Sequence, residues 1–122
     1  MINPAIAIVD DDLGILKGLK RLLEARGFTT KVFQSGEEFL QSDEVDRTAC
    51  VILDIHMVGM SGIETRRVLS AKGSRVPVIF MTALETEAVR REAIDSGCAG
   101  FLSKPFSGRV LIEAIQSAVA NL

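Results

Sequence analysis

The 122-residue chain has no tryptophan or tyrosine, only two cysteines and only three prolines. The cysteines, Cys50 and Cys98, are not spaced like metal ligands, and the chain is long enough to fold without a disulfide framework. They therefore predict small buried apolar side chains in a reducing compartment. An excess of basic charge is also lacking, because 14 Lys and Arg against 16 Asp and Glu leave a net charge of -2. No chain-wide basic surface for nucleic acid or an anionic membrane is expected.

Long hydrophobic runs are absent as well. No segment has the charged start and apolar centre of a signal peptide, and none has the roughly 18 continuous apolar residues of a membrane span. We therefore expect a cytoplasmic protein. The apolar content of 48% is sufficient for one hydrophobic core, and no linker, repeat or low-complexity tract interrupts the chain, so residues 1–122 are predicted to form one domain.

Short apolar segments that are typical of buried strands alternate with segments of helical period. The strands are predicted at 5–9, 29–33, 50–53, 76–81 and 100–102. Repeated strand–helix units with continuously apolar strands predict an α/β protein whose parallel sheet is covered by helices on both faces, with right-handed crossovers.

The helices between these strands have recognisable ends. Apolar residues recur at helical spacing over 15–23, and Gly27 ends this first helix. Ser35 with Glu38, and Ser61 with Glu64, fit the reciprocal capping box and begin the next two helices. The last two helices are predicted at 86–96, before Gly97, and at 107–122.

Polar side chains gather where the predicted strands end. They are Asp10, Asp11 and Asp12 after the first strand, Asp54 at the end of the third, Thr82 after the fourth, and Lys104 with Pro105 after the fifth. The carboxyl ends of parallel strands share one edge of the sheet, which is where ligands bind in open α/β sheets. This edge is therefore the predicted functional site.

The residue types at this edge indicate phosphate chemistry. Carboxylates about 4 Å apart repel by roughly 4 kcal/mol per pair at an effective dielectric of 20, so a divalent cation is expected among them. Oxygen ligands favour Mg²⁺, which completes its coordination shell with phosphate oxygens. Lys104 offers a positive charge and Thr82 a hydroxyl for phosphoryl oxygens, while a carboxylate such as Asp54 can act as nucleophile.

Four short motifs follow one another in the order of these strands. They are Ile-Val-Asp-Asp-Asp at 8–12, Ile-Leu-Asp at 52–54, Met-Thr-Ala at 81–83 and Lys-Pro-Phe at 104–106. Together they resemble the receiver domain of bacterial two-component response regulators over essentially the whole chain. The segment Val-Phe-Gln-Ser-Gly-Glu-Glu-Phe-Leu at 32–40 is similar to receivers of the FixJ/NarL type. The resemblance implies the flavodoxin-like (CheY-like) fold, a five-stranded parallel sheet in the order 2-1-3-4-5.

The resemblance also implies a role for each acidic residue of the edge. Asp54 is the implied phosphorylation site, which accepts a phosphoryl group from a histidine kinase. Asp11 is an implied direct Mg²⁺ ligand, Asp10 a metal partner through water, and the backbone carbonyl of His56 a further ligand. Asp12 lies outside this site and is expected to cap the first helix.

Switching is implied for residues on the neighbouring strands. Lys104 and Thr82 would hold the phosphoryl oxygens, and Phe101 would swing inward as Thr82 moves toward them. The surface of the fourth helix, fifth strand and fifth helix would then control an output. Full-length relatives of the FixJ type usually carry a DNA-binding domain, so any contact with nucleic acid is expected outside this chain. One departure is that Val58 stands where the family often has proline.

Several structural interpretations accompany these roles. Thr82 with Glu85 fits a capping box for the fourth helix, which is compatible with a role at the site. The His56 ring is imaginable as a general base, but a side chain at the rim of a loop is the expected state. The apolar residues Leu111, Ile112 and Ile115 exceed one narrow stripe of the fifth helix, which favours coverage by a second copy and hence a homodimer.

Two other functions remain open at this point. Asp10-Asp11-Asp12 contains the Asp-x-Asp of haloacid-dehalogenase-like phosphatases, but Gly14 stands where those enzymes have Thr or Val, and the chain has no length for a cap. An interaction module that is never phosphorylated is the third possibility, against which the retention of Asp54, Thr82 and Lys104 speaks. The favoured receiver is not an enzyme, except that it assists its own phosphorylation and dephosphorylation.

Overall fold

Strands and helices alternate throughout residues 5–120, which are the residues described by the computed structural model. The elements are β1 (Ala5–Val9), α1 (Leu13–Ala25), β2 (Thr29–Phe33), α2 (Gly36–Gln41), the short 3₁₀ helix η1 (Val45–Arg47), β3 (Cys50–Asp54), α3 (Gly62–Ala71), β4 (Val78–Thr82), α4 (Glu87–Asp95), β5 (Gly100–Ser103) and α5 (Gly108–Ala120). All strand pairs of the described sheet are parallel, in the order β2-β1-β3-β4-β5, so the predicted fold is confirmed.

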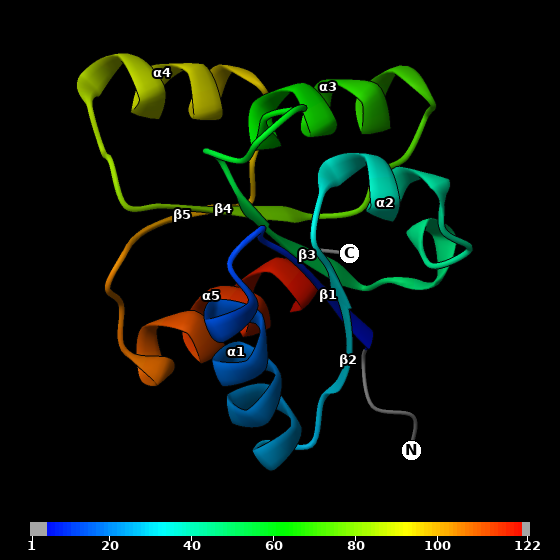
Figure 1. The fold of residues 1–122 in the computed structure, drawn as a ribbon, viewed down its shortest axis with the longest axis vertical. Coiled ribbons are helices and arrows are strands. Elements are labelled where there is room, and N and C mark those ends of the chain that lie inside the picture. Colours follow the sequence, from blue (N-terminus) through cyan, green and yellow to red (C-terminus); the bar gives the residue numbers. More distant parts are fainter. Residues whose placement is uncertain (1–4, 121–122) are drawn as a thin grey trace.

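The helices form one layer on each face of the sheet. Figure 1 shows α1 and α5 together below the sheet and α2, α3 and α4 above it. The apolar side chains of each strand divide between the two layers, because successive side chains of a strand point to opposite faces. On β1, for example, Ile6 and Ile8 pack with α1 and α5, whereas Ala7 and Val9 pack with α2 and α3. Coverage of both faces explains why these strands are continuously apolar.

Two helix starts agree with the sequence in full. Asp12 caps α1, and its carboxylate accepts the backbone N–H groups of Gly14 at 2.8 Å and Ile15 at 3.2 Å. Ser61 and Glu64 form the complete reciprocal capping box of α3. Both caps satisfy N–H groups that the helix itself leaves without partners, and both lie next to the edge where the predicted site residues stand.

Two other predicted caps are corrected. Ser35 accepts the N–H of Glu38 as expected, but the Glu38 carboxylate accepts the N–H of Gln34 rather than that of Ser35, so this box is only half formed. The capping box of Thr82 and Glu85 is wrong. Thr82 is still part of β4, and α4 begins one turn later, after Thr86 caps it.

Element boundaries shift by one or two residues from those predicted. The fourth strand begins at Val78 rather than at 76, because Pro77 has no N–H to donate to a neighbouring strand. The third, fourth and fifth strands each extend one residue further, to Asp54, Thr82 and Ser103. The fourth helix is one residue shorter at each end, Glu87–Asp95, and the fifth helix begins at Gly108. Residues 121 and 122 of the predicted last helix lie outside the described residues.

Two burial expectations also change. Cys50 is buried as predicted, whereas Cys98 is only half-buried, in the turn before β5. The wide apolar face of α5 is covered within the chain, because Leu111, Ile112 and Ile115 are all buried against the sheet. Their number therefore gives no support to a homodimer, which stays a prediction.

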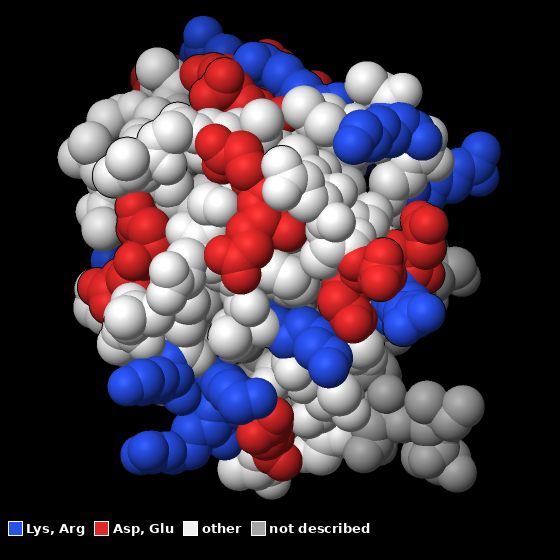
Figure 2. Space-filling model, turned by 45° about the vertical axis from the view of Figure 1, so that its right-hand side comes forward, with Lys and Arg blue, Asp and Glu red and all other residues white. Residues whose placement is uncertain are grey.

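The surface carries both signs of charge. Figure 2 shows acidic and basic side chains scattered over the displayed face rather than separated into one basic surface, in keeping with the near balance of charge. Among the described helices, none has the length and apolar character that crossing a membrane requires.

Candidate functional site

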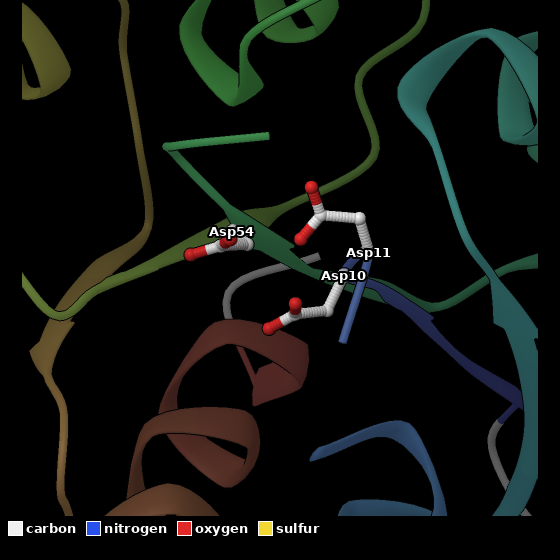
Figure 3. Close-up of side chains that lie close together, drawn as sticks. All are labelled: Asp10, Asp11 and Asp54. Atoms are coloured by element: carbon white, nitrogen blue, oxygen red, sulfur yellow. The ribbon is translucent and has the colours of Figure 1, made fainter. Parts of the chain in front are cut away.

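Three carboxylates meet at the predicted edge of the sheet. Asp10 and Asp11 directly follow β1, and Asp54 is the last residue of the neighbouring strand β3. One oxygen of each residue lies within 4.8 Å of the others, and Figure 3 shows the three side chains converging. Asp10 is 1% exposed and Asp54 4% exposed, whereas Asp11 is exposed to solvent. The edge is thus a small acidic site that is open on one side.

Lys104 links the two buried carboxylates. Its Nζ lies 2.8 Å from Asp10 Oδ2 and 3.2 Å from Asp54 Oδ1. Its backbone N–H donates to the carbonyl of Thr82 at 2.7 Å, which fixes the end of β5 to the end of β4. The loop after β5 therefore brings a positive charge to the acidic site from a strand that is not adjacent to either carboxylate.

The electrostatics of the site show a deficit of positive charge. Burial, the negative charge of Asp10 and, to a lesser degree, that of Asp11 raise the pKa of Asp54 from 3.8 to about 6, although Lys104 opposes the shift. Burial alone would lower the pKa of Lys104, but its hydrogen bond to Asp10 and the charge of Asp54 outweigh burial and raise it. One ammonium does not balance three carboxylates. A divalent cation on these oxygen donors would supply the missing charge, so the residues present fit a cation such as Mg²⁺.

Backbone hydrogen bonds hold two of the carboxylates. Asp10 Oδ1 accepts the N–H of Asp12 at 2.9 Å, while its other oxygen accepts the Lys104 ammonium. Asp11 Oδ2 accepts the N–H of Val58 at 3.0 Å, from the loop that follows β3. In the sequence, Val58 was singled out only because it stands where the family often has proline. The signal was nevertheless present, since valine has the backbone N–H that proline lacks.

The predicted switch residues lie on β4 and β5, the two strands that follow β3 across the sheet. Thr82 is fully buried, and its hydroxyl accepts the N–H of Leu84 at 3.1 Å and donates to the carbonyl of Leu84 at 3.2 Å. Phe101 on the edge strand β5 is half-buried, and the guanidinium of Arg90 stands 5.7 Å from its ring centroid. Glu85 connects α4 with β5, because it accepts hydrogen bonds from both Arg90 and Ser103. The Thr82 hydroxyl therefore bonds to the backbone of the loop after β4, and not to the acidic site.

His56 and Gly62 frame the loop after β3. The His56 side chain is exposed, in agreement with the expected position at the rim. Gly62, the first residue of α3, was missed by sequence reasoning. Its N–H donates to the carbonyl of Ile55 at 2.9 Å, and a Cβ at this position would collide with the backbone carbonyl of Asp54. Glycine therefore allows α3 to start directly against the strand that carries Asp54.

Comparison with known proteins agrees with this geometry. The chain is 34% identical to the transcriptional regulatory protein FixJ of Rhizobium meliloti over 100% of its own length and 60% of FixJ. It is 30% identical to the transcriptional regulatory protein TdiR of Thauera aromatica over 94% of its own length and 51% of TdiR. The chain thus spans roughly half the length of the curated relatives it matches.

Solved structures show the same relationship. The crystal structure of FixJ-N matches with a TM-score of 0.89 and 33% identity, over 100% of this chain and 98% of that one. The BeF₃-activated DrrB receiver domain matches with a TM-score of 0.87 and 28% identity, over 98% and 99% of the two chains. The family model described as "Response regulator receiver domain" matches residues 6–116. The chain therefore belongs to the family of response regulator receiver domains.

Proposed function

We propose that this receiver accepts a phosphoryl group on Asp54 from a phosphohistidine of a histidine kinase. The observation that carries the proposal is the meeting of three carboxylates and Lys104 at one sheet edge, in a chain of this family. In the transfer, a carboxylate oxygen of Asp54 forms a bond to phosphorus as the nitrogen–phosphorus bond of the donor breaks. The electron pair of that bond returns to the histidine ring.

The side chains around Asp54 would have different roles in this transfer. A pKa of about 6 leaves Asp54 mostly ionised, and therefore nucleophilic, near neutral pH. Lys104 is already within 3.2 Å of Asp54 and is placed to bind an oxygen of the incoming phosphoryl group. Asp10, Asp11 and Asp54, with the backbone carbonyl of His56, would hold Mg²⁺. When bound, the ion neutralises the charge that carboxylates and phosphoryl oxygens bring together.

Switching would follow from a competition for the Thr82 hydroxyl. To reach a phosphoryl oxygen on Asp54, this hydroxyl has to leave the backbone of Leu84, to which it now bonds. An inward turn of Phe101 would likewise give up its contact with Arg90. A phosphoryl group that binds one of two states more tightly shifts the population toward that state. We propose that the surface of α4, β5 and α5 reports this shift and serves for homodimerisation.

The output would lie beyond this chain. The relatives FixJ and TdiR are transcriptional regulatory proteins of which the match covers only 60% and 51%, which supports transcription control through a DNA-binding domain as the output. The BeF₃-activated form of the DrrB receiver supports activation by a phosphoryl-like group at such a site. We retain the cytoplasm as the proposed location. Because the chain is a receiver domain and not a conventional enzyme, the phosphatase hypothesis has no support.

Intact mass spectrometry after incubation with acetyl phosphate and Mg²⁺ tests the proposal. The wild type is expected to gain the mass of one phosphoryl group, whereas Asp54→Asn and a chelator-treated sample gain none. Far-UV circular dichroism on the same samples shows that each is folded. A folded wild type that stays unmodified across a Mg²⁺ titration would contradict the proposal and favour the interaction module.

A further inference from the structure

We propose that the backbone N–H of Val58 is a positioning group of the cation site, and that it holds Asp11 in the orientation needed for binding the ion. This inference rests on the cation site of the proposed function and adds a residue to it. It concerns the one carboxylate of the three that lies exposed at the surface.

Asp11 needs a positioning contact more than its two neighbours do. Asp10 and Asp54 are almost completely buried and both contact Lys104, so their side chains have little freedom. An exposed aspartate loses rotamer freedom when it binds an ion, and that loss weakens the binding. A contact that fixes the side chain before the ion arrives removes part of this cost.

The hydrogen bond from Val58 meets this requirement. The Val58 N–H donates to Asp11 Oδ2 at 3.0 Å, across 47 positions of the sequence. A carboxylate has two oxygens, so one can accept the N–H while the other faces the ion. Figure 3 shows one oxygen of Asp11 turned toward Asp10 and Asp54 and the other turned away from them.

The valine side chain does not explain why this residue stands here. It is 87% exposed and therefore adds little to the hydrophobic core. The contact of Val58 with the acidic site is made by the backbone N–H, which a proline at this position would lack. The contribution of Val58 to the site is thus made by its backbone amide. The side chain and the amide can therefore be tested by separate variants.

The same hydrogen bond ties the loop after β3 to the loop after β1. This loop carries the His56 carbonyl, a further proposed ligand, and it is fixed at its far end by the hydrogen bond from Gly62 N–H to the Ile55 carbonyl. Glu37 Oε2 accepts the N–H of Met60 at 3.4 Å in between. The Val58 contact thus places the loop and Asp11 relative to each other before any ion binds.

The dissociation constant for Mg²⁺, measured by isothermal titration calorimetry, tests the inference with a matched pair of variants. Val58→Pro removes the N–H and is expected to weaken Mg²⁺ binding about three- to tenfold, the effect of losing one solvent-exposed hydrogen bond of ordinary strength. Val58→Ala keeps the N–H and is expected to bind Mg²⁺ as the wild type does. Equal affinities of the wild type and Val58→Pro would overturn the inference, and so would an equal loss of affinity in both variants.

A backbone ester at position 58 separates the hydrogen bond from a change of loop shape. Chemical ligation with the hydroxy acid analogue of valine replaces the N–H by oxygen and keeps the side chain, so the ester is expected to weaken Mg²⁺ binding as Val58→Pro does. Wild-type affinity in the ester protein would overturn the inference. In the metal-free protein, Asp11→Ala is expected to move the Val58 amide proton resonance upfield, and an unmoved resonance counts against the contact.

Failure of the inference is distinguishable from failure of the proposed function. If the wild type binds Mg²⁺ and all variants match it, only the role of Val58 is overturned. If the wild type binds no Mg²⁺, the cation site fails and the inference fails with it. The readout is binding of the metal alone, so it does not depend on phosphorylation of Asp54.

Discussion

Replacement of Asp54 by asparagine is expected to stabilise the metal-free protein at neutral and higher pH. The carboxyl is 4% exposed, and burial together with the charge of Asp10 raises its pKa from 3.8 to about 6 in the folded state. Between these two values the native state binds more protons than the unfolded state, so the free energy of unfolding falls as the pH rises. Above about pH 6 the whole penalty is present, because Asp54 is then ionised in both states.

The magnitude follows from the size of the shift. A rise from 3.8 to about 6 corresponds to about 3 kcal/mol of destabilisation at pH 8. Asparagine has nearly the same shape and carries no charge, so Asp54→Asn is expected to gain about 2–3 kcal/mol at pH 8. The gain is expected to shrink toward zero as the pH falls to about 4, where the wild-type carboxyl is also largely neutral.

Urea unfolding in the presence of a chelator measures this difference at a series of pH values. Far-UV circular dichroism is the appropriate signal, because the chain has no tryptophan or tyrosine for fluorescence. Asp43→Asn is a suitable control, since Asp43 is exposed and its replacement is expected to change stability by less than about 0.5 kcal/mol. An Asp54→Asn variant that is no more stable than the wild type at pH 8, or whose gain does not change with pH, would show that ionised Asp54 does not destabilise the fold.

Other predictions concern the backbone, a helix cap and the cation. Gly62→Ala is expected to lower the free energy of unfolding in urea by about 2 kcal/mol or more, because the added Cβ meets the Asp54 carbonyl. Gly18→Ala on α1 meets no neighbour and is expected to raise it by up to about 1 kcal/mol. Equal effects of the two substitutions would contradict this. Ser61→Ala is expected to lower the thermal midpoint through loss of about 1 kcal/mol of capping energy, and an unchanged midpoint counts against the cap. Mg²⁺ at one hundred times its Kd is expected to add about 2.7 kcal/mol to wild-type stability. The same concentration should add clearly less to Asp11→Asn.

Most of the site could be predicted because the local sequence pattern indicates which strands are buried and where each strand ends. Continuously apolar strands predicted a covered parallel sheet, and that sheet brings Asp10 and Asp54 to one edge with Lys104. The order of the strands has no such local signal and came from the family resemblance alone. The contact of Val58 with Asp11 depends on how two distant loops meet, which no pattern within either loop specifies.

Where interpretation of the sequence failed, two local patterns competed. Thr82-x-x-Glu85 fits a capping box, but pairing with Ser103 of β5 keeps Thr82 in the strand, and Thr86 caps the helix instead. On α5, the width of the apolar face suggested a partner, whereas Ile112 is buried in the core that the sheet forms with α1 and α5. Tertiary contacts thus decided both cases, and the spacing of residues in the sequence does not indicate them.

Chemical mapping of the modified residue tests whether Asp54 itself carries the phosphoryl group. After phosphorylation by acetyl phosphate with Mg²⁺, borohydride reduces an aspartyl phosphate to homoserine, which peptide mass spectrometry locates in the chain. Homoserine is expected at position 54 of the wild type, with aspartate retained at positions 10 and 11. Homoserine at position 10 or 11, or at no position in a folded protein, would contradict it.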